Sequence, residues 1–210
     1  MNERFKLDPP WPATTQAAEG MRRRPWVTAE RLAPAGAGII AEKERLERTG
    51  GEVVPMSPKG ARHEMVKIDL NAHLQRIKPD NLRIAPETTL RLDENSFVEP
   101  DFCVFPKTIS PGDMRGYDVL LAIEVADTSL RYDLGRKIST YAAYGIPEVW
   151  VINASTLVTR VHRALGVAGY RDIAEFGPEA ELEAVRVPSI RVSLAALGLT
   201  PVKNEEDSIE

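Results

Sequence analysis

The sequence predicts a mixed α/β fold in which a central mixed β-sheet is flanked by helices. Helical patterns and short apolar segments follow one another in the order helix, strands, helix, strand. With 210 residues, 43% of them hydrophobic and 28% charged, the chain can bury a core as one domain. We expect a mobile N-terminal arm at 1–25, one folded domain at 26–199 and an acidic tail at 200–210.

Before residue 60 the expected elements are short. A helical turn is predicted from Thr28 to Leu32, and helix-forming residues run from Ile39 to Arg48. Gly50 and Gly51 end that segment because glycine disfavours a helix. Residues 52–56 then predict a short strand.

The clearest helix is expected at 61–78. Its apolar residues recur three or four positions apart, which places them on one helical face. They are Val66, Leu70, Leu74 and Ile77, and the stripe is widened by Met65, Ile68 and Ala72. After Pro79 and Asp80, partial alternation predicts one strand over 82–92, closed by a turn at 93–96.

The second half of the chain predicts the centre of the sheet. Apolar segments at 98–105 and 120–126 indicate strands, and a helix is expected at 132–144. Gly145, with Pro147 just beyond, is a typical helix C-terminus. The remaining expected elements are a strand at 148–152, a hairpin of 157–165 with 170–173, a strand at 181–187 and a short helix at 192–197.

Composition narrows the class of protein. Cys103 is the only cysteine, which excludes an internal disulfide and a cysteine-built zinc site and suits a reducing cytoplasm. No apolar run has membrane-spanning length, and residues 1–25 lack the apolar core of a signal peptide. We therefore expect a cytoplasmic protein with no membrane partner. The formal net charge of −4 argues against a protein that coats nucleic acid.

Three charged residues stand out because each lies in an apolar context. Glu124 interrupts the segment 120–126, Asp101 lies in the segment 98–105, and Lys137 lies on the flank of the apolar side of its helix. A buried carboxylate is costly unless it is paired, hydrogen-bonded or bound to a metal ion. Strand alternation places Glu124 beside small alanines, which leave room for a metal ion and a substrate.

Each of these residues also has an ordinary interpretation. Asp101 can be a strand-edge charge that faces water, Glu124 can form a structural ion pair with an arginine, and Lys137 can extend along its stem to water. Together they suit phosphodiester hydrolysis better. Two carboxylates bind Mg²⁺, for which Mn²⁺ can substitute, and a lysine orients the nucleophile or stabilises the transition state.

The order of these motifs resembles a known superfamily. Pro100-Asp101, then Glu124 in a strand, then Lys137 is similar to the PD-(D/E)XK nucleases, in the variant whose lysine has moved from the strand to the following helix. Longer segments resemble the Uma-two family of restriction-endonuclease-like proteins: 51–58, 62–63, 120–129, 132–137 and 141–152. The resemblance extends over 27–199 and implies a restriction-endonuclease-like core.

The resemblance implies a Mg²⁺-dependent DNA endonuclease. Asp101 and Glu124 would bind the metal ion, and Lys137 would assist catalysis. By the same analogy an acidic residue in the first helical segment completes the catalytic site, and Glu47 occupies that position. His63 is a candidate substrate-binding residue together with Arg62, although a lone helical histidine is more often structural.

Two alternatives to a DNA endonuclease stay open at this point: a non-catalytic interaction module that keeps the fold, and a hydrolase of another phosphoester. The basic residues are scattered along the chain, which predicts weak, salt-sensitive DNA binding. A homodimer would fit a double-strand break, because one site cuts one strand.

Overall fold

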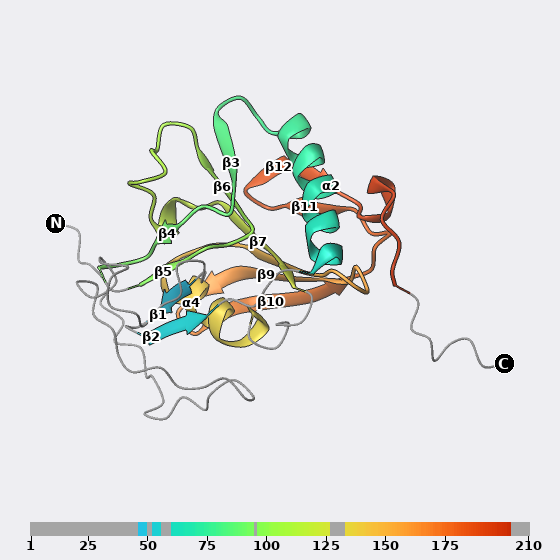
Figure 1. Ribbon diagram of the computed structural model, residues 1–210. Coiled ribbons are helices and arrows are strands. Elements are labelled where there is room, and N and C mark those ends of the chain that lie inside the picture. The colour runs from blue at the N-terminus through green and yellow to red at the C-terminus, as the bar shows by residue number, and fades with distance from the viewer. Residues whose placement is uncertain (1–45, 50–51, 56–59, 95, 127–132, 203–210) are drawn as a thin grey trace, which may run out of the picture.

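The computed structural model describes residues 46–49, 52–55, 60–94, 96–126 and 133–202 (Figure 1). The arm expected at the N-terminus, the helical turn expected after Thr28 and the last eight residues of the chain lie outside these ranges and stay predictions.

A six-stranded mixed sheet forms the centre of the molecule, in the order β10-β9-β8-β7-β6-β3. β7 and β8 are parallel, and the other neighbouring pairs are antiparallel. The strands are β3 (Leu82–Pro86), β6 (Phe102–Pro106), β7 (Leu121–Ala126), β8 (Val149–Asn153), β9 (Thr159–Gly166) and β10 (Gly169–Phe176). The predicted fold class is confirmed.

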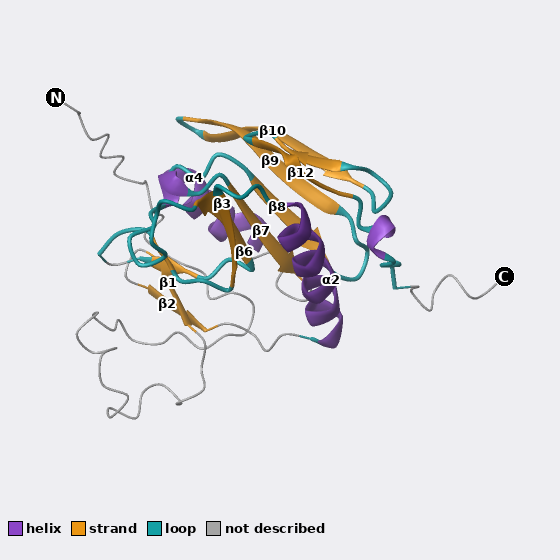
Figure 2. Ribbon diagram, turned by 90° about the horizontal axis from the view of Figure 1, so that it is seen from above, coloured by secondary structure: helices purple, strands orange, loops and turns teal. Residues whose placement is uncertain are grey.

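Helices cover the two faces of this sheet (Figures 1 and 2). α2 (Ala61–Ile77) lies on one face, where its buried leucines join a core that contains Ile123 and Trp150. α4 (Ile138–Ala143) lies on the other, where Tyr141 packs in a second core with Ala122. Successive residues of a strand point to opposite faces, so β7 contributes to both cores. No helix in the described ranges is long and apolar enough to cross a membrane.

The connection from β7 to β8 carries η3 (Asp133–Lys137), a single π-helical turn that leads directly into α4. Parallel neighbouring strands need such a crossover, and a helix usually provides it. Gly145 follows α4 with a φ of +83°, a left-handed conformation that glycine adopts without steric cost. The expected helix end at Gly145 is therefore confirmed.

Two smaller sheets flank the main one. A four-stranded sheet has the order β2-β1-β5-β4, and β11 pairs with β12 in a two-stranded sheet. The strands of these two sheets are β1 (Leu46–Thr49), β2 (Glu52–Pro55), β4 (Leu90–Arg91), β5 (Phe97–Val98), β11 (Leu182–Ala184) and β12 (Val187–Val192). Two short 3₁₀-helices, η2 (Gly116–Asp118) and η4 (Ala195–Leu197), lie in the described part of the chain.

The helix expected from Ile39 to Arg48 is wrong over its described residues. Leu46–Thr49 is a strand, and its register pairs Leu46 with Pro55 and Thr49 with Glu52 in a hairpin with β2. Cross-strand pairing decides the conformation here, because helix propensity is a weak preference that a neighbouring strand overrides. Glu47 therefore lies on a strand and not on a helix.

The strands expected at 82–92 and 98–105 are each split in two. β3 and β6 pair in the main sheet, whereas β4 and β5 pair in the small sheet. The first break lies at Glu87, whose φ is +46°, and its N–H donates to the carbonyl oxygen of Asp101 at 3.1 Å. The two segments leave the main sheet together, so Asp101 follows a corner and immediately precedes β6.

Two further expectations are corrected. The segment expected as a strand at 181–187 and a helix at 192–197 is a hairpin of β11 and β12, and only Ala195–Leu197 is helical. Met65 and Ile68 do not widen the buried stripe of α2. They are 51% and 65% exposed, because α2 lies on the sheet by one face only.

Candidate active site

Three acidic residues form a row across the ends of β3, β6 and β7. Phe102 pairs with Ile123, so the next position places Asp101 opposite Glu124. Phe102 also pairs with Pro86, so the following residue, Glu87, lies on the other side of Asp101. Residues opposite each other in an antiparallel pair have Cβ atoms about 5 Å apart. The three carboxylates therefore follow directly on the last residue pairs that β6 forms with β3 and β7, and we call them the carboxylate row.

Glu124 is buried in the carboxylate row and contacts two groups from the crossover connection. The Lys137 Nζ atom lies 2.9 Å from its Oε1 atom, and the Tyr141 hydroxyl donates to the same oxygen. Lys137 is only 4% exposed, so the alternative in which its ammonium reaches water is wrong. The π-helical turn ends at Lys137, and α4 carries Tyr141 one turn later. The two residues therefore approach Glu124 from one helical face.

Asp101 is also buried, which contradicts the alternative of a strand-edge charge facing water. Its Oδ2 atom accepts the Val125 N–H at 2.8 Å and lies 3.3 Å from the His63 Nε2 atom. The Lys67 Nζ atom lies 3.7 Å from its Oδ1 atom. The bond to Val125 fixes this carboxylate against the backbone next to Glu124.

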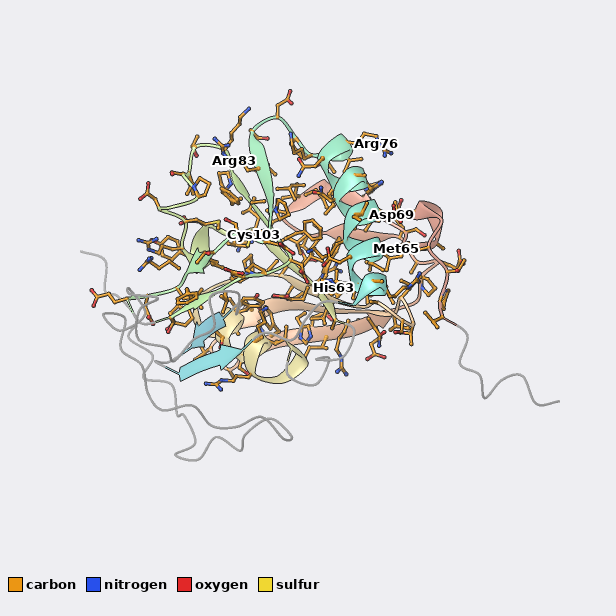
Figure 3. The ribbon with its side chains drawn as sticks, viewed as in Figure 1. His63, Met65, Asp69, Arg76, Arg83 and Cys103 are labelled. Carbon is orange, nitrogen blue, oxygen red and sulfur yellow. The ribbon has the colours of Figure 1, made fainter. Side chains whose placement is uncertain are left out.

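The first turns of α2 bring His63 and Lys67 to the carboxylate row. The two residues are four positions apart, hence on one face of the helix, and both are buried. His63 lies at the N-terminal end of α2, opposite the end that carries Arg76 (Figure 3). Its Nδ1 atom is 3.2 Å from Glu64 Oε1, and Lys67 also contacts Glu64 and Glu87. α2 thus supplies basic groups to Asp101, as the crossover connection does to Glu124.

A model of the Uma2 family, described as "Putative restriction endonuclease", matches residues 29–195 of the sequence. The chain belongs to the Uma2 family. The resemblance inferred from the sequence motifs is confirmed.

A comparison with solved structures found one with a similar fold and one with a weaker likeness. The first is the 1.96 Å crystal structure of a putative nuclease belonging to DUF820 from Anabaena variabilis. It is 16% identical, aligns over 72% of this chain and 88% of its own chain, and has a TM-score of 0.56. The DrdV–DNA complex aligns over 54% of this chain and 12% of its own, at 10% identity and a TM-score of 0.33, and supports no conclusion. Among curated proteins, none matches the sequence.

The structure brings four of the predicted site residues of this Uma2 protein together: Asp101, Glu124, Lys137 and His63. Their catalytic and binding roles stay predictions. The Arg62 guanidinium bonds to the carbonyl oxygens of Ala154, at 2.9 Å, and Thr200. It ties α2 to the C-terminal segment, and its expected contact with substrate also stays a prediction.

Glu47 lies in the small four-stranded sheet and not in the main sheet that carries Glu124. It lies on β1, opposite Val54 of β2, in the small sheet. The helical placement that suggested its role is wrong, and the role itself stays a prediction.

Three residues of the site were missed by the sequence prediction: Lys67, Glu87 and Tyr141. Two of them had a signal, because Lys67 follows His63 by four residues and Tyr141 follows Lys137 by four. Both spacings place the pairs on one helical face. Glu87 had no such signal, since its place in the carboxylate row depends on the break between β3 and β4.

Cys103 lies on the same face of the sheet as Glu124 but has no reactive thiolate. It pairs with Ala122 across β6 and β7, and Figure 3 places it within the sheet. Burial raises the pKa of the Cys103 thiol well above its usual range, the Glu124 carboxylate raises this pKa further, and the Lys137 ammonium only partly offsets both. A thiol of this kind is neither a nucleophile nor a metal ligand.

The carboxylate row suits a hard divalent metal ion. Asp101 and Glu124 offer oxygen donors, which Mg²⁺ and Mn²⁺ prefer. Among the described residues, no group of three or more histidine, cysteine, aspartate or glutamate side chains is arranged to hold a metal ion. Two carboxylates nevertheless fit Mg²⁺, which usually keeps several waters and takes its other ligands from substrate phosphates.

Proposed function

We propose that this Uma2 protein is a metal-dependent endonuclease that hydrolyses phosphodiester bonds in DNA, with Mg²⁺ as the metal ion and Mn²⁺ as a substitute. One observation carries the proposal: two buried carboxylates lie close to each other, because Asp101 accepts the N–H of Val125, the residue after Glu124, and the Lys137 ammonium lies 2.9 Å from Glu124. The family description and the name of the Anabaena protein support the same activity.

Asp101 and Glu124 would bind the metal ion through carboxylate oxygens. The bound ion supplies an acidified water and neutralises charge on the phosphate. Val125 and His63 hold the Asp101 carboxylate, and Tyr141 holds that of Glu124. Lys137 places a positive charge beside Glu124, where it would stabilise the negative charge that develops on the scissile phosphate.

The burial of Asp101, Glu124 and the two lysines beside them argues for catalysis over a purely structural role. Removing charged groups from water costs several kcal/mol per ion, and apolar residues of similar volume usually stabilise a core at least as well. A non-catalytic interaction module has no need for two buried lysine–carboxylate pairs in one row. A catalytic site needs this arrangement, because its charges must be fixed before the substrate arrives.

Cleavage of supercoiled plasmid in Mg²⁺ or Mn²⁺ tests the proposal. We expect nicked or linear DNA from the wild type and roughly a hundredfold or greater loss in Asp101→Ala and Lys137→Met, which remove a metal ligand and a stabilising charge. Lys107→Met is the matched control, because Lys107 is exposed and follows the far end of β6.

Equal cleavage by wild type and variants would contradict the assignment, since a contaminating nuclease would explain it. The protein would instead be a hydrolase of another phosphoester if it hydrolysed a small phosphodiester and excess duplex DNA did not inhibit this reaction. Thermal unfolding of each variant shows whether a loss of activity reflects a loss of folding.

A further inference from the structure

Lys67 is the second buried ammonium at the carboxylate row. Its Nζ atom lies 3.7 Å from Asp101 Oδ1 and 3.5 Å from Glu64 Oε1, and it also contacts Glu87 Oε1. Its side chain is only 9% exposed. Lys137 is likewise buried, and its Nζ atom forms an ion pair with Glu124. Each of the two carboxylates proposed to bind metal therefore has a lysine of its own, supplied by a different helix.

A divalent ion at Asp101 would meet Lys67 as a like charge. Two unit charges 4 Å apart interact with about 4 kcal/mol at the effective dielectric constant near a protein surface. Lys67 and a metal ion therefore compete for Asp101. Glu87 offers the ammonium another place, because its carboxylate already contacts Lys67 and is 35% exposed at the end of the carboxylate row.

We propose that Lys67, which contacts both Glu87 and Asp101, neutralises Asp101 until a metal ion binds there, and that Glu87 then holds the ammonium without Asp101. Lys67 is in this sense a positioning residue, which sets the metal affinity of Asp101 by competition. The inference rests on the proposed metal site but not on DNA cleavage. Its test therefore measures metal binding in the absence of DNA.

Lys67→Met removes the charge and keeps most of the length of the side chain. We expect this variant to bind Mn²⁺ roughly three- to tenfold more tightly in calorimetric titrations, because the competing ammonium is gone. We also expect its metal-free form to unfold at a lower temperature, because the neighbouring carboxylates lose their counterion. A merely structural lysine would give the second effect without the first.

Glu87→Gln should have the opposite effect on Mn²⁺ affinity. Without the Glu87 charge, Lys67 is held by Asp101 more strongly, and we expect the affinity to weaken by a similar factor. The double variant Lys67→Met/Glu87→Gln should match Lys67→Met alone, because the effect of Glu87 passes through Lys67. Weaker binding in the double variant than in Lys67→Met would make Glu87 a direct ligand and overturn the proposal.

Lys107→Met removes the same charge about 20 Å from Asp101 along β6 and is the matched control. Equal tightening in Lys107→Met and Lys67→Met would reduce the effect to net charge and overturn the proposal, as would unchanged affinity in Lys67→Met. Glu87→Gln carries the test if Lys67→Met does not fold. A protein that shows these shifts yet cuts no DNA would refute the nuclease and leave the competition intact, whereas a wild type that binds no metal would refute both.

Discussion

At the scale of single residues, polar groups in this protein have very different surroundings. Glu124 and Asp101 are buried but supplied with donors from a lysine, a tyrosine hydroxyl, a histidine and a backbone N–H. His162, on the α4 side of the same sheet, is also buried, yet both of its ring nitrogens lack a hydrogen-bond partner in the described part of the chain. It packs edge-on against Tyr170, with ring centroids 5.6 Å apart.

Because His162 is buried without a hydrogen-bond partner among the described residues, we expect its protonation to make the stability of the fold depend on pH. Burial, reinforced by the positive charge of Arg160, lowers the pKa of His162 from 6.5 to about 4. The unfolded chain keeps the ordinary pKa and binds the proton first, so the contribution of His162 is complete above about pH 6.5 and is lost as the pH falls toward 4.

As the pH falls from about 6.5 to about 4, we expect the free energy of unfolding of the wild type to decrease by roughly 1–2 kcal/mol more than that of His162→Phe. Urea unfolding at several pH values measures this difference. The comparison with the variant removes the contribution of the carboxylates, which titrate in both proteins. Parallel pH profiles for the two proteins would contradict the prediction.

At the scale of elements, a buried carboxylate, that of Glu148, helps to join the β11–β12 hairpin to the main sheet. Glu148 Oε1 accepts hydrogen bonds from Trp150 Nε1 and Arg163 Nε, both at 2.8 Å. Its Oε2 atom accepts the N–H of Val185, in the turn of the hairpin, at 2.8 Å. This side chain thus links β8, β9 and the hairpin, and β12 of the hairpin packs against α2.

Replacing Glu148 with alanine should lower the free energy of unfolding by about 3 kcal/mol, because Arg163 and two N–H donors lose their buried partner. The control is Glu175→Ala, which breaks an exposed ion pair with Arg160 and should cost less than about 0.5 kcal/mol. Chemical denaturation of both variants checks the prediction. Equal losses would show that Glu148 acts as an ordinary surface charge.

At the scale of the whole molecule, the net charge of the chain is negative and does not attract nucleic acid. The formal net charge is −4, and the two lysines nearest the carboxylate row are each held by carboxylates. Long-range attraction to DNA should therefore be slight, and binding should depend on a few direct phosphate contacts.

A homodimer stays a prediction, and sedimentation of the full chain would test it.

We expect weak, salt-sensitive DNA binding that depends on a small number of phosphate contacts. Each neutralised phosphate contributes about −0.9 to the slope of log affinity against log salt, so two to four contacts give a slope of roughly −2 to −4. Fluorescence anisotropy of a labelled duplex with the Glu124→Gln variant measures this slope without cleavage. A slope near −8, typical of an extended basic interface, would contradict the prediction.

The residue patterns of the sequence predicted the mixed sheet, the helix over 61–78, the Glu124 strand and three of the four predicted site residues that the structure brings together: Asp101, Glu124 and Lys137. These features have local signals: helical spacing, strand alternation, and charges set in apolar segments. Sequence periodicity registers such patterns because they repeat within a few residues.

Only the tertiary structure decided the remaining features. The corner that places Glu87 beside Asp101 depends on two strands leaving the main sheet together, and the strand at Leu46–Thr49 depends on its hairpin partner. The partners of Asp101 come from α2 and β7, 24 to 38 residues away in the sequence. Pairing over such separations follows from how the elements pack, and a window of neighbouring residues does not contain it.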